Sequence, residues 1–252
     1  MSMRKDLHRA VREVALQIAI DGPAGAGKST VGRNLARALG CPYLDTGLMY
    51  RAVALRALEQ GVPPSDGEAL AALARGIRFE LDRGPSGRLL IDGEPPASAL
   101  HSSQVDEIVS EVSAHVAVRR ALLDTQRELA DEECIVMMGR DIGTTVLPSA
   151  PVKLWITASP EARASRRRTQ RQAQPDGFAG DEMLGRITRR DRWDAGRDAS
   201  PLRKAPDAVT IDTGSRSPRE TLDRALETVQ AVLSGSPGES MHRPSPRPTP
   251  SE

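Results

Sequence analysis

A nine-residue stretch, Gly22–Thr30, constrains this chain of 252 residues more than any other feature. Its sequence, GPAGAGKST, fills every fixed position of the phosphate-binding pattern G-x-x-x-x-G-K-[ST]. Glycines in such a loop permit backbone angles and a close approach that a Cβ would block. The loop amides can then point inward at an anion, and the following helix adds unpaired N–H groups and its dipole. The residues expected to hold a nucleoside triphosphate are Gly22, Pro23, Ala24, Gly25, Ala26, Gly27, Lys28, Ser29 and Thr30.

Both flanks of this loop agree with the pattern. Leu16–Ile20 is a short apolar run and predicts a buried strand. After the loop, apolar residues recur at helical spacing as far as Leu39, and Gly40 stands where a helix would end. In this setting Lys28 would supply a point charge for the β- and γ-phosphates, and the hydroxyl of Ser29 would be a ligand for Mg²⁺.

Composition excludes several other classes of protein. Aromatic residues are only 2% of the chain, which argues against a stacking platform for single-stranded nucleic acid. The net charge of +1 gives no general attraction to nucleic acid or to anionic membranes. The two cysteines, Cys41 and Cys134, suggest neither a disulfide framework nor a structural zinc site.

The ends of the chain differ from its middle. Met1–Val14 is charged throughout and predicts a frayed extension or a short helix rather than a signal peptide. No apolar run reaches membrane-spanning length, so we expect a cytoplasmic protein. Residues 234–252 are rich in Pro, Ser and Gly and are expected to be disordered.

A second candidate site begins after the first helix. Tyr43–Leu44 predicts a short strand, and Asp45–Gly47 turns into a helix that carries Arg51. An arginine near a helix start could grip a monophosphate with both guanidinium arms, although the local pattern by itself favours a solvated helix arginine. Asp66–Arg75 predicts a further short helix.

An inserted segment follows. Ile77–Leu81 and Arg88–Asp92 alternate apolar and polar residues, which predicts an antiparallel hairpin. Ser102–Glu133 predicts a helical region, in which Ser110 and Arg119 lie off the most apolar stripe and would be surface residues on pattern alone.

A third candidate site lies at the end of a buried strand. Ile135–Met138 is a continuous apolar run that predicts a parallel strand, and Gly139–Thr144 follows it directly. Because ligands of open α/β sheets bind at the carboxyl ends of strands, Arg140 and Asp141 are expected beside the loop at Gly22. A local ion pair in a turn is the alternative.

The last third of the chain is rich in arginine. Val152–Ile156 predicts a strand, and Ser159 with Pro160 opens a helix. We interpret residues 159–204 as a lid that brings arginines over the transferring phosphates; an RNA-binding helix and a solvated face are the alternatives. Ala208–Asp212 and the helix from Ser217 to Leu233 complete the fold. The lid arginines expected to act in catalysis are Arg163 and Arg167.

Four blocks together resemble one known family, the bacterial cytidylate kinases, which are nucleoside monophosphate kinases. The blocks are Ile20–Lys28, Leu44–Arg51, Gly139–Thr144, and Arg190-Asp191 with Asp194, Arg197 and Pro201-Leu202. The resemblance implies an α/β fold: a parallel-sheet P-loop kinase core with helices on both faces, an inserted monophosphate-binding subdomain with a small antiparallel sheet, and an arginine-rich helical lid. The implied divisions are an N-terminal extension (1–14), a kinase domain (15–233) and a tail (234–252). Within the kinase domain the core would be 15–44, 134–158 and 205–233, the insert 45–133 and the lid 159–204.

The same resemblance implies roles for particular residues. The cytosine would be recognised by Thr46, Ser110, Arg119 and Asp141, and the phosphate of the acceptor nucleotide would be held by Arg51, Arg140 and Arg197. Arg190 and Asp194 would reach the sugar or the phosphate. Lys28, Arg140, Arg163, Arg167 and Arg190 would act in catalysis, with Ser29 on the metal.

The expected reaction is transfer of the γ-phosphoryl group of ATP to CMP or dCMP in pyrimidine nucleotide metabolism, with Mg²⁺. We expect a monomer that binds these small molecules and neither nucleic acid nor membrane. Alternatives are a kinase for another small acceptor, such as a different monophosphate or shikimate, and an RNA-binding module. A regulatory GTPase would need a guanine-reading N-K-x-D block, which the sequence lacks.

Overall fold

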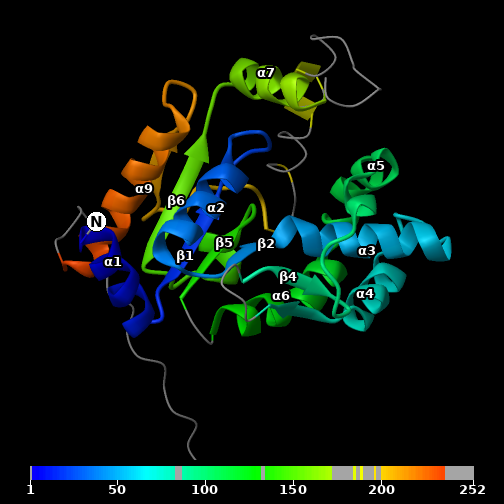
Figure 1. The fold of residues 1–252 in the computed structure, drawn as a ribbon. Coiled ribbons are helices and arrows are strands. Elements are labelled where there is room, and N and C mark those ends of the chain that lie inside the picture. Colours follow the sequence, from blue (N-terminus) through cyan, green and yellow to red (C-terminus); the bar gives the residue numbers. More distant parts are fainter. Residues whose placement is uncertain are drawn as a thin grey trace, which may run out of the picture.

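A five-stranded parallel sheet forms the centre of the protein (Figure 1). The computed structural model describes residues 2–82, 87–131, 134–171, 184–185, 188–189, 196 and 200–235. The strand order is β2-β5-β1-β6-β7. In chain order the elements are α1 (Ser2–Glu13), β1 (Gln17–Asp21), α2 (Lys28–Leu39), β2 (Tyr43–Asp45), α3 (Thr46–Gln60), α4 (Gly67–Gly76), β3 (Phe79–Leu81), β4 (Leu89–Ile91), η1 (Ser98–His101), α5 (Ser103–Val112), α6 (Val116–Asp131), β5 (Ile135–Met138), η2 (Ile142–Val146), β6 (Val152–Thr157), α7 (Pro160–Arg171), β7 (Val209–Asp212) and α9 (Pro218–Leu233).

Strand β1 is the middle strand of this sheet. It pairs in parallel with β5, where Ile20 faces Met138, and with β6, where Ile18 faces Val152. The apolar runs predicted as buried parallel strands are therefore confirmed. Because β1 and β5 are parallel neighbours, the phosphate loop after Asp21 and the Gly139–Thr144 segment leave the sheet at the same edge.

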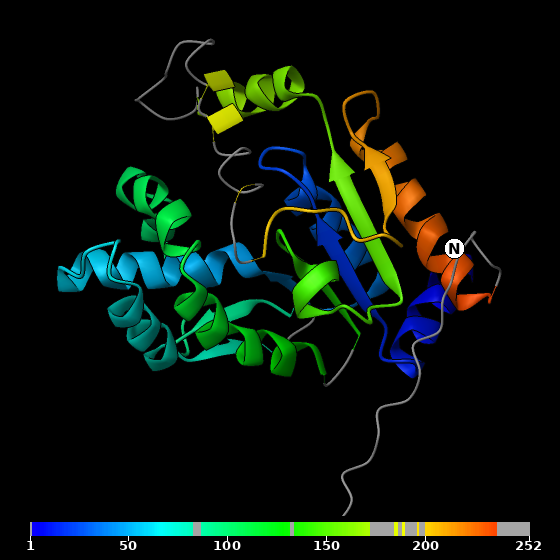
Figure 2. The same cartoon turned by 180° about the vertical axis from the view of Figure 1, so that it is seen from behind.

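Two apolar cores lie on opposite sides of the sheet. On one side Ile18 and Ile20 of β1 pack with α1, α2 and α9. On the other side Ala19 and Met137 pack with residues of α3, α4, α5, α6 and η2. Strand residues alternate between the two cores because successive side chains point to opposite faces. Seen from both sides, α3–α6 form a block beside the sheet, away from α1 and α9 (Figures 1 and 2).

The block of α3–α6 holds the predicted hairpin. Strands β3 and β4 pair antiparallel, with Phe79 opposite Ile91, as the alternating pattern predicts. The predicted helical region from Ser102 to Glu133 is wrong in one respect, because α5 ends at Val112 and α6 begins at Val116. The carbonyl of Ser113, the residue after α5, accepts a hydrogen bond from Arg119, so this break shapes the candidate site.

The ends of the described chain pack on the first core. The N-terminal segment forms the short helix α1, in which Val11 is fully buried. Ser217 and Glu220 form a capping box at the start of α9, the last helix that the sequence predicts. Within the described part of the chain, we find no helix whose length and apolar character would let it cross a membrane. The predicted tail, 234–252, lies outside the described residues except for Ser234 and Gly235.

Candidate active site

The phosphate loop has the backbone conformation that its glycines permit. Gly22, Gly25 and Gly27 have φ values of 146°, 76° and 90°. A Cβ on Gly22 would lie 2.0 Å from the carbonyl oxygen of Ile156, so only glycine fits between the loop and β6. Gly27 is the N-cap of α2 and no side chain caps this helix start. The first amides of α2 therefore remain available to an anion.

Lys28 and Ser29 are the first two residues of α2. The Nζ atom of Lys28 donates to the carbonyl oxygen of Pro23 over 2.8 Å, which curls this buried side chain across the loop. Ser29 lines a cavity next to the loop, whereas the side chain of Thr30 is exposed. The loop thus offers a cation, a hydroxyl and backbone amides on one side of the cavity.

This cavity joins the three candidate sites of the sequence. It lies between the phosphate loop, the start of α3, the end of β5 and the α5–α6 junction. Five residues expected to hold the acceptor nucleotide line it. The full lining is Ala24, Gly25, Lys28, Ser29, Asp45, Thr46, Gly47, Tyr50, Arg51, Val109, Ser113, Arg119, Met138, Gly139, Arg140 and Asp141.

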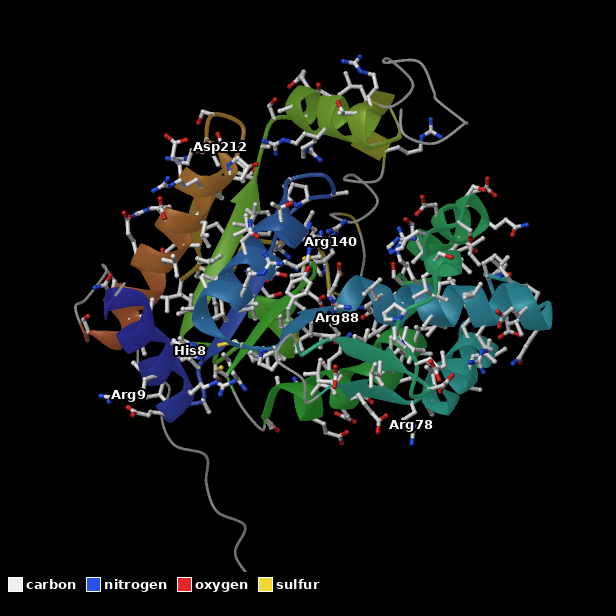
Figure 3. All side chains as sticks on the ribbon, in the orientation of Figure 1. His8, Arg9, Arg78, Arg88, Arg140 and Asp212 are labelled. Atoms are coloured by element: carbon white, nitrogen blue, oxygen red, sulfur yellow. The ribbon has the colours of Figure 1, made fainter. Side chains whose placement is uncertain are left out.

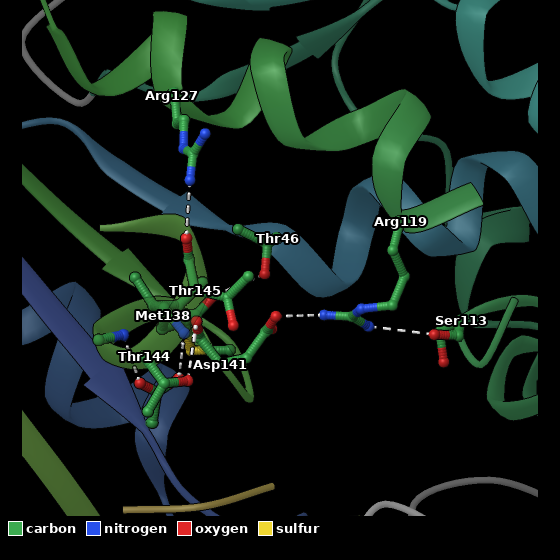
Figure 4. Close-up of polar contacts among 11 residues, drawn as sticks. Thr46, Ser113, Arg119, Arg127, Met138, Asp141, Thr144 and Thr145 are labelled. Atoms are coloured by element: carbon green, nitrogen blue, oxygen red, sulfur yellow. Dashed lines mark hydrogen bonds and ion pairs between the residues drawn. The ribbon is translucent and has the colours of Figure 1, made fainter. Parts of the chain in front are cut away.

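Arg119 and Asp141 form a buried ion pair at one wall (Figure 4). Arg119 Nη2 lies 2.5 Å from Asp141 Oδ2, and Arg119 Nη1 donates to the carbonyl of Ser113 over 3.0 Å. The guanidinium carbon lies 5.3 Å from the ring centre of Tyr50. Arg119 is only 8% exposed, so the surface position suggested by its helical pattern is wrong. A buried charge needs partners, and this arginine has a carboxylate, a carbonyl and an aromatic face.

Thr46 and Arg140 connect the cavity walls to the strands. Buried Thr46 donates from its Oγ1 to the carbonyl of Met138, the last residue of β5, over 3.0 Å. Arg140 Nη1 donates to the carbonyl of Gly22 over 3.1 Å. Figure 3 places Arg140 between the phosphate loop and the α3–α5 block. The segment after β5 is thereby linked to both other walls.

Arg51 faces the cavity from α3. Its Nη1 donates to the carbonyl of Leu100 over 2.8 Å, and its Nη2 lies 2.5 Å from Asp106 Oδ1. Both side chains of this ion pair are partly buried, at 14% and 23% exposed. The ion pair holds the side chain of Arg51 against α5. Arg51 is therefore not a solvated arginine.

Sequence reasoning assigned no role to several lining residues. Asp45 and Tyr50 lie in a recognised sequence block, and their positions beside Thr46 and Arg51 could have indicated them. Ser113 has no such signal, because its place depends on where α5 ends. Ser110, by contrast, does not line the cavity; it is half-buried, and its carbonyl accepts from Ser113 Oγ over 3.2 Å.

Two aspartates near the loop have raised pKa values. Burial raises the pKa of Asp21 to about 6, while hydrogen bonds from the amides of Gly143 and Ile142 lower it. Burial likewise raises the pKa of the Asp45 carboxyl above its ordinary value, and nearby Lys28 opposes the rise. Desolvation disfavours a charged carboxylate, and the surrounding donors and cations offset part of this cost.

The arginines that we expect to belong to the lid are described only in part. Arg163 is 4% exposed and donates to the carbonyls of Ala158 and Ala24, both over 3.1 Å, so it braces the phosphate loop from behind. Arg166 donates to the Oγ1 and carbonyl oxygen of Thr213 over 2.7 and 2.6 Å. The side chain of Arg167, and all of Arg190, Asp194 and Arg197, lie outside the described residues.

The residues present suit a magnesium ion. Ser29 and Asp45 place oxygen atoms on the cavity beside Lys28. In the described part of the chain, no group of three or more His, Cys, Asp or Glu side chains could hold a metal ion. Mg²⁺ commonly takes one or two protein oxygens together with substrate phosphates and water, and this sparse set fits that mode.

Comparisons with known proteins agree with this geometry. A family model described as cytidylate kinase matches residues 18–231. The cytidylate kinase of Mycolicibacterium paratuberculosis (strain ATCC BAA-968 / K-10) is 46% identical over 217 residues, which cover 84% of this chain and 94% of that protein. The enzymes of Geobacillus kaustophilus (strain HTA426) and Exiguobacterium sp. (strain ATCC BAA-1283 / AT1b) are 46% and 43% identical. Those matches cover 85% and 86% of this chain and 96% and 99% of the two relatives.

The similarity to solved structures is weaker than the similarity to these sequences. A gluconokinase from Sinorhizobium meliloti 1021 gives a TM-score of 0.47 at 15% identity, covering 87% of this chain and 94% of that chain. The assignment therefore rests on the sequence comparisons and on the three sites that meet at one cavity. On these grounds the chain belongs to the cytidylate kinase family.

Proposed function

We propose that this chain transfers the γ-phosphoryl group of ATP to CMP or dCMP, giving ADP and CDP or dCDP. One observation carries the proposal. A single cavity is lined by the phosphate loop, by the cations Arg51 and Arg140, and by the buried Arg119–Asp141 pair. Such a cavity can hold a phosphate donor and a nucleoside monophosphate side by side.

The phosphate loop would bind ATP. Its amides, the start of α2 and Lys28 would surround the β- and γ-phosphates. Phosphoryl transfer proceeds through a loose transition state, so positioning and charge stabilisation supply most of the catalysis. Arg140 lines the cavity and is bonded to the carbonyl of Gly22 in the phosphate loop, and it would stabilise charge on the transferring group. No general base is required, because the attacking oxygen of a monophosphate is already anionic.

The opposite walls would bind the acceptor nucleotide. Arg51 would hold its phosphate, with Arg197 from the lid, and Arg190 with Asp194 would reach the sugar or phosphate. A cytosine presents a donor, the 4-amino group, and two acceptors, N3 and O2. Asp141 supplies an acceptor, Arg119 supplies donors and Thr46 supplies a hydroxyl, which complements this edge. Ser110 would contribute to cytosine recognition indirectly, because its carbonyl holds the side chain of Ser113, which lines the cavity.

Magnesium would be held by Ser29 together with the phosphates, with Asp45 close by. When bound, the ion neutralises charge on the β- and γ-phosphates. The protein's own contribution is to orient the phosphates with Lys28 and to exclude water with the lid, where Arg163 braces the loop and Arg167 would face the phosphates. Exclusion of water matters because hydrolysis of ATP competes with transfer.

A coupled assay of ADP release tests the proposal, with CMP, dCMP, UMP and AMP as separate acceptors. We expect rapid release with CMP or dCMP and slow release with AMP. Equal rates with AMP and CMP would overturn the cytosine assignment, and ADP release that no acceptor stimulates would overturn the kinase itself. The cytoplasmic location, the monomeric state, the absence of nucleic-acid partners and the domain boundaries stay predictions.

A further inference from the structure

We propose that Asp21 is a positioning residue for acceptor selection: it caps the start of η2, so that the Asp141 carboxylate is left to pair with Arg119 and face the base. The inference rests on the proposed function of the cavity. It concerns a residue that precedes the phosphate loop but acts on the other nucleotide site.

Asp21 is the last residue of β1 and is only 4% exposed. Its two carboxylate oxygens accept hydrogen bonds from two consecutive backbone amides. Ile142 N donates to Oδ1 over 2.9 Å, and Gly143 N donates to Oδ2 over 2.7 Å. Both contacts are buried, and they link residues more than 100 positions apart. A bidentate contact of this kind fixes the direction of the backbone that it binds.

Asp141 stands at the position where a side chain would normally cap η2. Its carboxylate makes no capping hydrogen bond, although Asp is among the residues best suited to this role. Instead Asp141 Oδ2 pairs with Arg119 at the cavity wall, as Figure 4 shows. A capping Asp141 would bind the amide of Gly143 or Thr144, and the Gly143 amide is instead bound by Asp21, together with that of Ile142. Asp21 thus binds the backbone amides at the start of η2, and the carboxylate of Asp141 can pair with Arg119 at the cavity wall.

The surrounding contacts hold this arrangement tightly. Arg140 Nη1 donates to the carbonyl of Gly22, so the segment is joined to the end of β1 at a second point. A Cβ on Gly143 would lie 3.1 Å from Cδ of Lys153 and 3.4 Å from Asp21 Oδ2. There is consequently little room for the segment to shift without disturbing Asp141.

Burial raises the pKa of Asp21, and nearby Asp141 raises it further. The hydrogen bonds from the Gly143 and Ile142 amides lower this pKa more than nearby Lys28 does, so these two amides are the main support of its charged form. The Nζ atom of Lys153, on β6, turns away to Asp207 and the carbonyl of Pro148. Among the described contacts no cation pairs directly with Asp21. The amides of Ile142 and Gly143 are therefore its main partners.

The test is Asp21→Asn, which keeps the shape but sets an NH₂ group against one of the two amides. We expect KM for CMP to rise about tenfold, as loss of one buried hydrogen bond implies. The ratio of kcat/KM for CMP to that for UMP should fall by about the same factor, while KM for ATP stays within about twofold. A merely structural defect at the end of β1 would disturb the phosphate loop and raise KM for ATP as well.

Two further variants make the test specific. In an Asp141→Asn background, Asp21→Asn should add no further loss for CMP, because it acts through Asp141. Asp207→Asn, which removes the partner of Lys153 without touching Ile142 or Gly143, should leave both KM values unchanged. If Asp21→Asn does not yield folded protein, Gly143→Ala strains the same contact from the other side and should show the same selective loss.

The outcomes separate the two proposals. A wild-type chain that does not phosphorylate CMP would refute the proposed function. A wild-type chain that does, with Asp21→Asn and Gly143→Ala raising KM for ATP as much as KM for CMP, or changing neither, would overturn the positioning role alone. Additive losses in the double variant would also overturn it.

Discussion

Lys28 is the loop residue that we expect to contribute most directly to phosphoryl transfer. Its ammonium group already lies over the loop, bonded to the Pro23 carbonyl, so little reorganisation is needed when phosphates enter. Such preorganised charges stabilise a transition state more than water does. The buried position of Lys28 also means that its charge is weakly screened.

Lys28→Ala should therefore reduce kcat by about a hundredfold or more, which is the effect of removing one preorganised charge. Steady-state kinetics with saturating ATP and CMP measure this change. The exposed Lys204 offers a matched control, because Lys204→Ala removes the same group away from the cavity. Near-normal turnover of the Lys28 variant would contradict the proposed binding mode.

Asp21 gives the unfolding free energy a distinctive pH dependence. Its pKa in the folded chain is about 6 against an ordinary 3.8, so folding favours the protonated form. Its contribution to stability is therefore greatest below pH 3.8 and declines as the pH rises to about 6. Asp21→Asn is neutral throughout and lacks this decline.

Urea unfolding of both proteins between about pH 4 and 7 measures the difference. One pKa unit corresponds to about 1.4 kcal/mol, so the variant should gain roughly 2–2.5 kcal/mol relative to the wild type across this range. Comparing the two proteins at each pH cancels the titration of the groups that do not interact with Asp21. A difference that does not change with pH would mean that Asp21 ionises normally.

Helix α7 is joined to the phosphate loop by side-chain hydrogen bonds, one of them direct and one through Thr213. Arg166 of α7 bonds Thr213, whose Oγ1 in turn donates to the carbonyl of Ala26 over 2.9 Å. Arg163 reaches the carbonyl of Ala24 from the same helix. Helix and loop are thus held together by side-chain contacts rather than by chain connectivity.

Arg166→Ala should loosen this contact, lower the unfolding free energy by about 1–2 kcal/mol and raise KM for ATP more than KM for CMP. Thermal unfolding and steady-state kinetics measure the two effects. Arg168, exposed on the same helix, provides the control variant Arg168→Ala. If KM for CMP rose as much as KM for ATP, the link between α7 and the loop would not be specific.

The sequence predicted the core elements well, for physical reasons that can be named. Strands β1 and β5 are buried on both faces and are therefore continuous apolar runs, and the loop conformation requires glycines at fixed places. The buried position of Arg119 could not be predicted, because a charged residue off the apolar stripe is usually solvated. Its partner Asp141 lies on another element, and local periodicity carries no information about such contacts. The end of α5 was missed because apolar spacing continues through it.

At the scale of the whole molecule, β1 occupies a special position. It is hydrogen-bonded to a neighbour on each edge, and an apolar core covers each face. The β3–β4 hairpin, in contrast, is a separate two-stranded sheet, and of its strand residues only Phe79 and Leu89 are buried. Local stability follows from burial and pairing, so the two regions should differ greatly in how often they open.

Hydrogen–deuterium exchange should show this difference in the exchange rates of the backbone amides. Amides of β1 and β5 should exchange last, with the free energy of global unfolding, and those of the hairpin should exchange earlier through local opening. Mass spectrometry of peptides from the two regions measures the rates, and equal rates would contradict the gradient. The phosphate loop directly follows β1, so the proposed ATP site should keep its shape for longer than the hairpin that belongs to the same block as the proposed acceptor site.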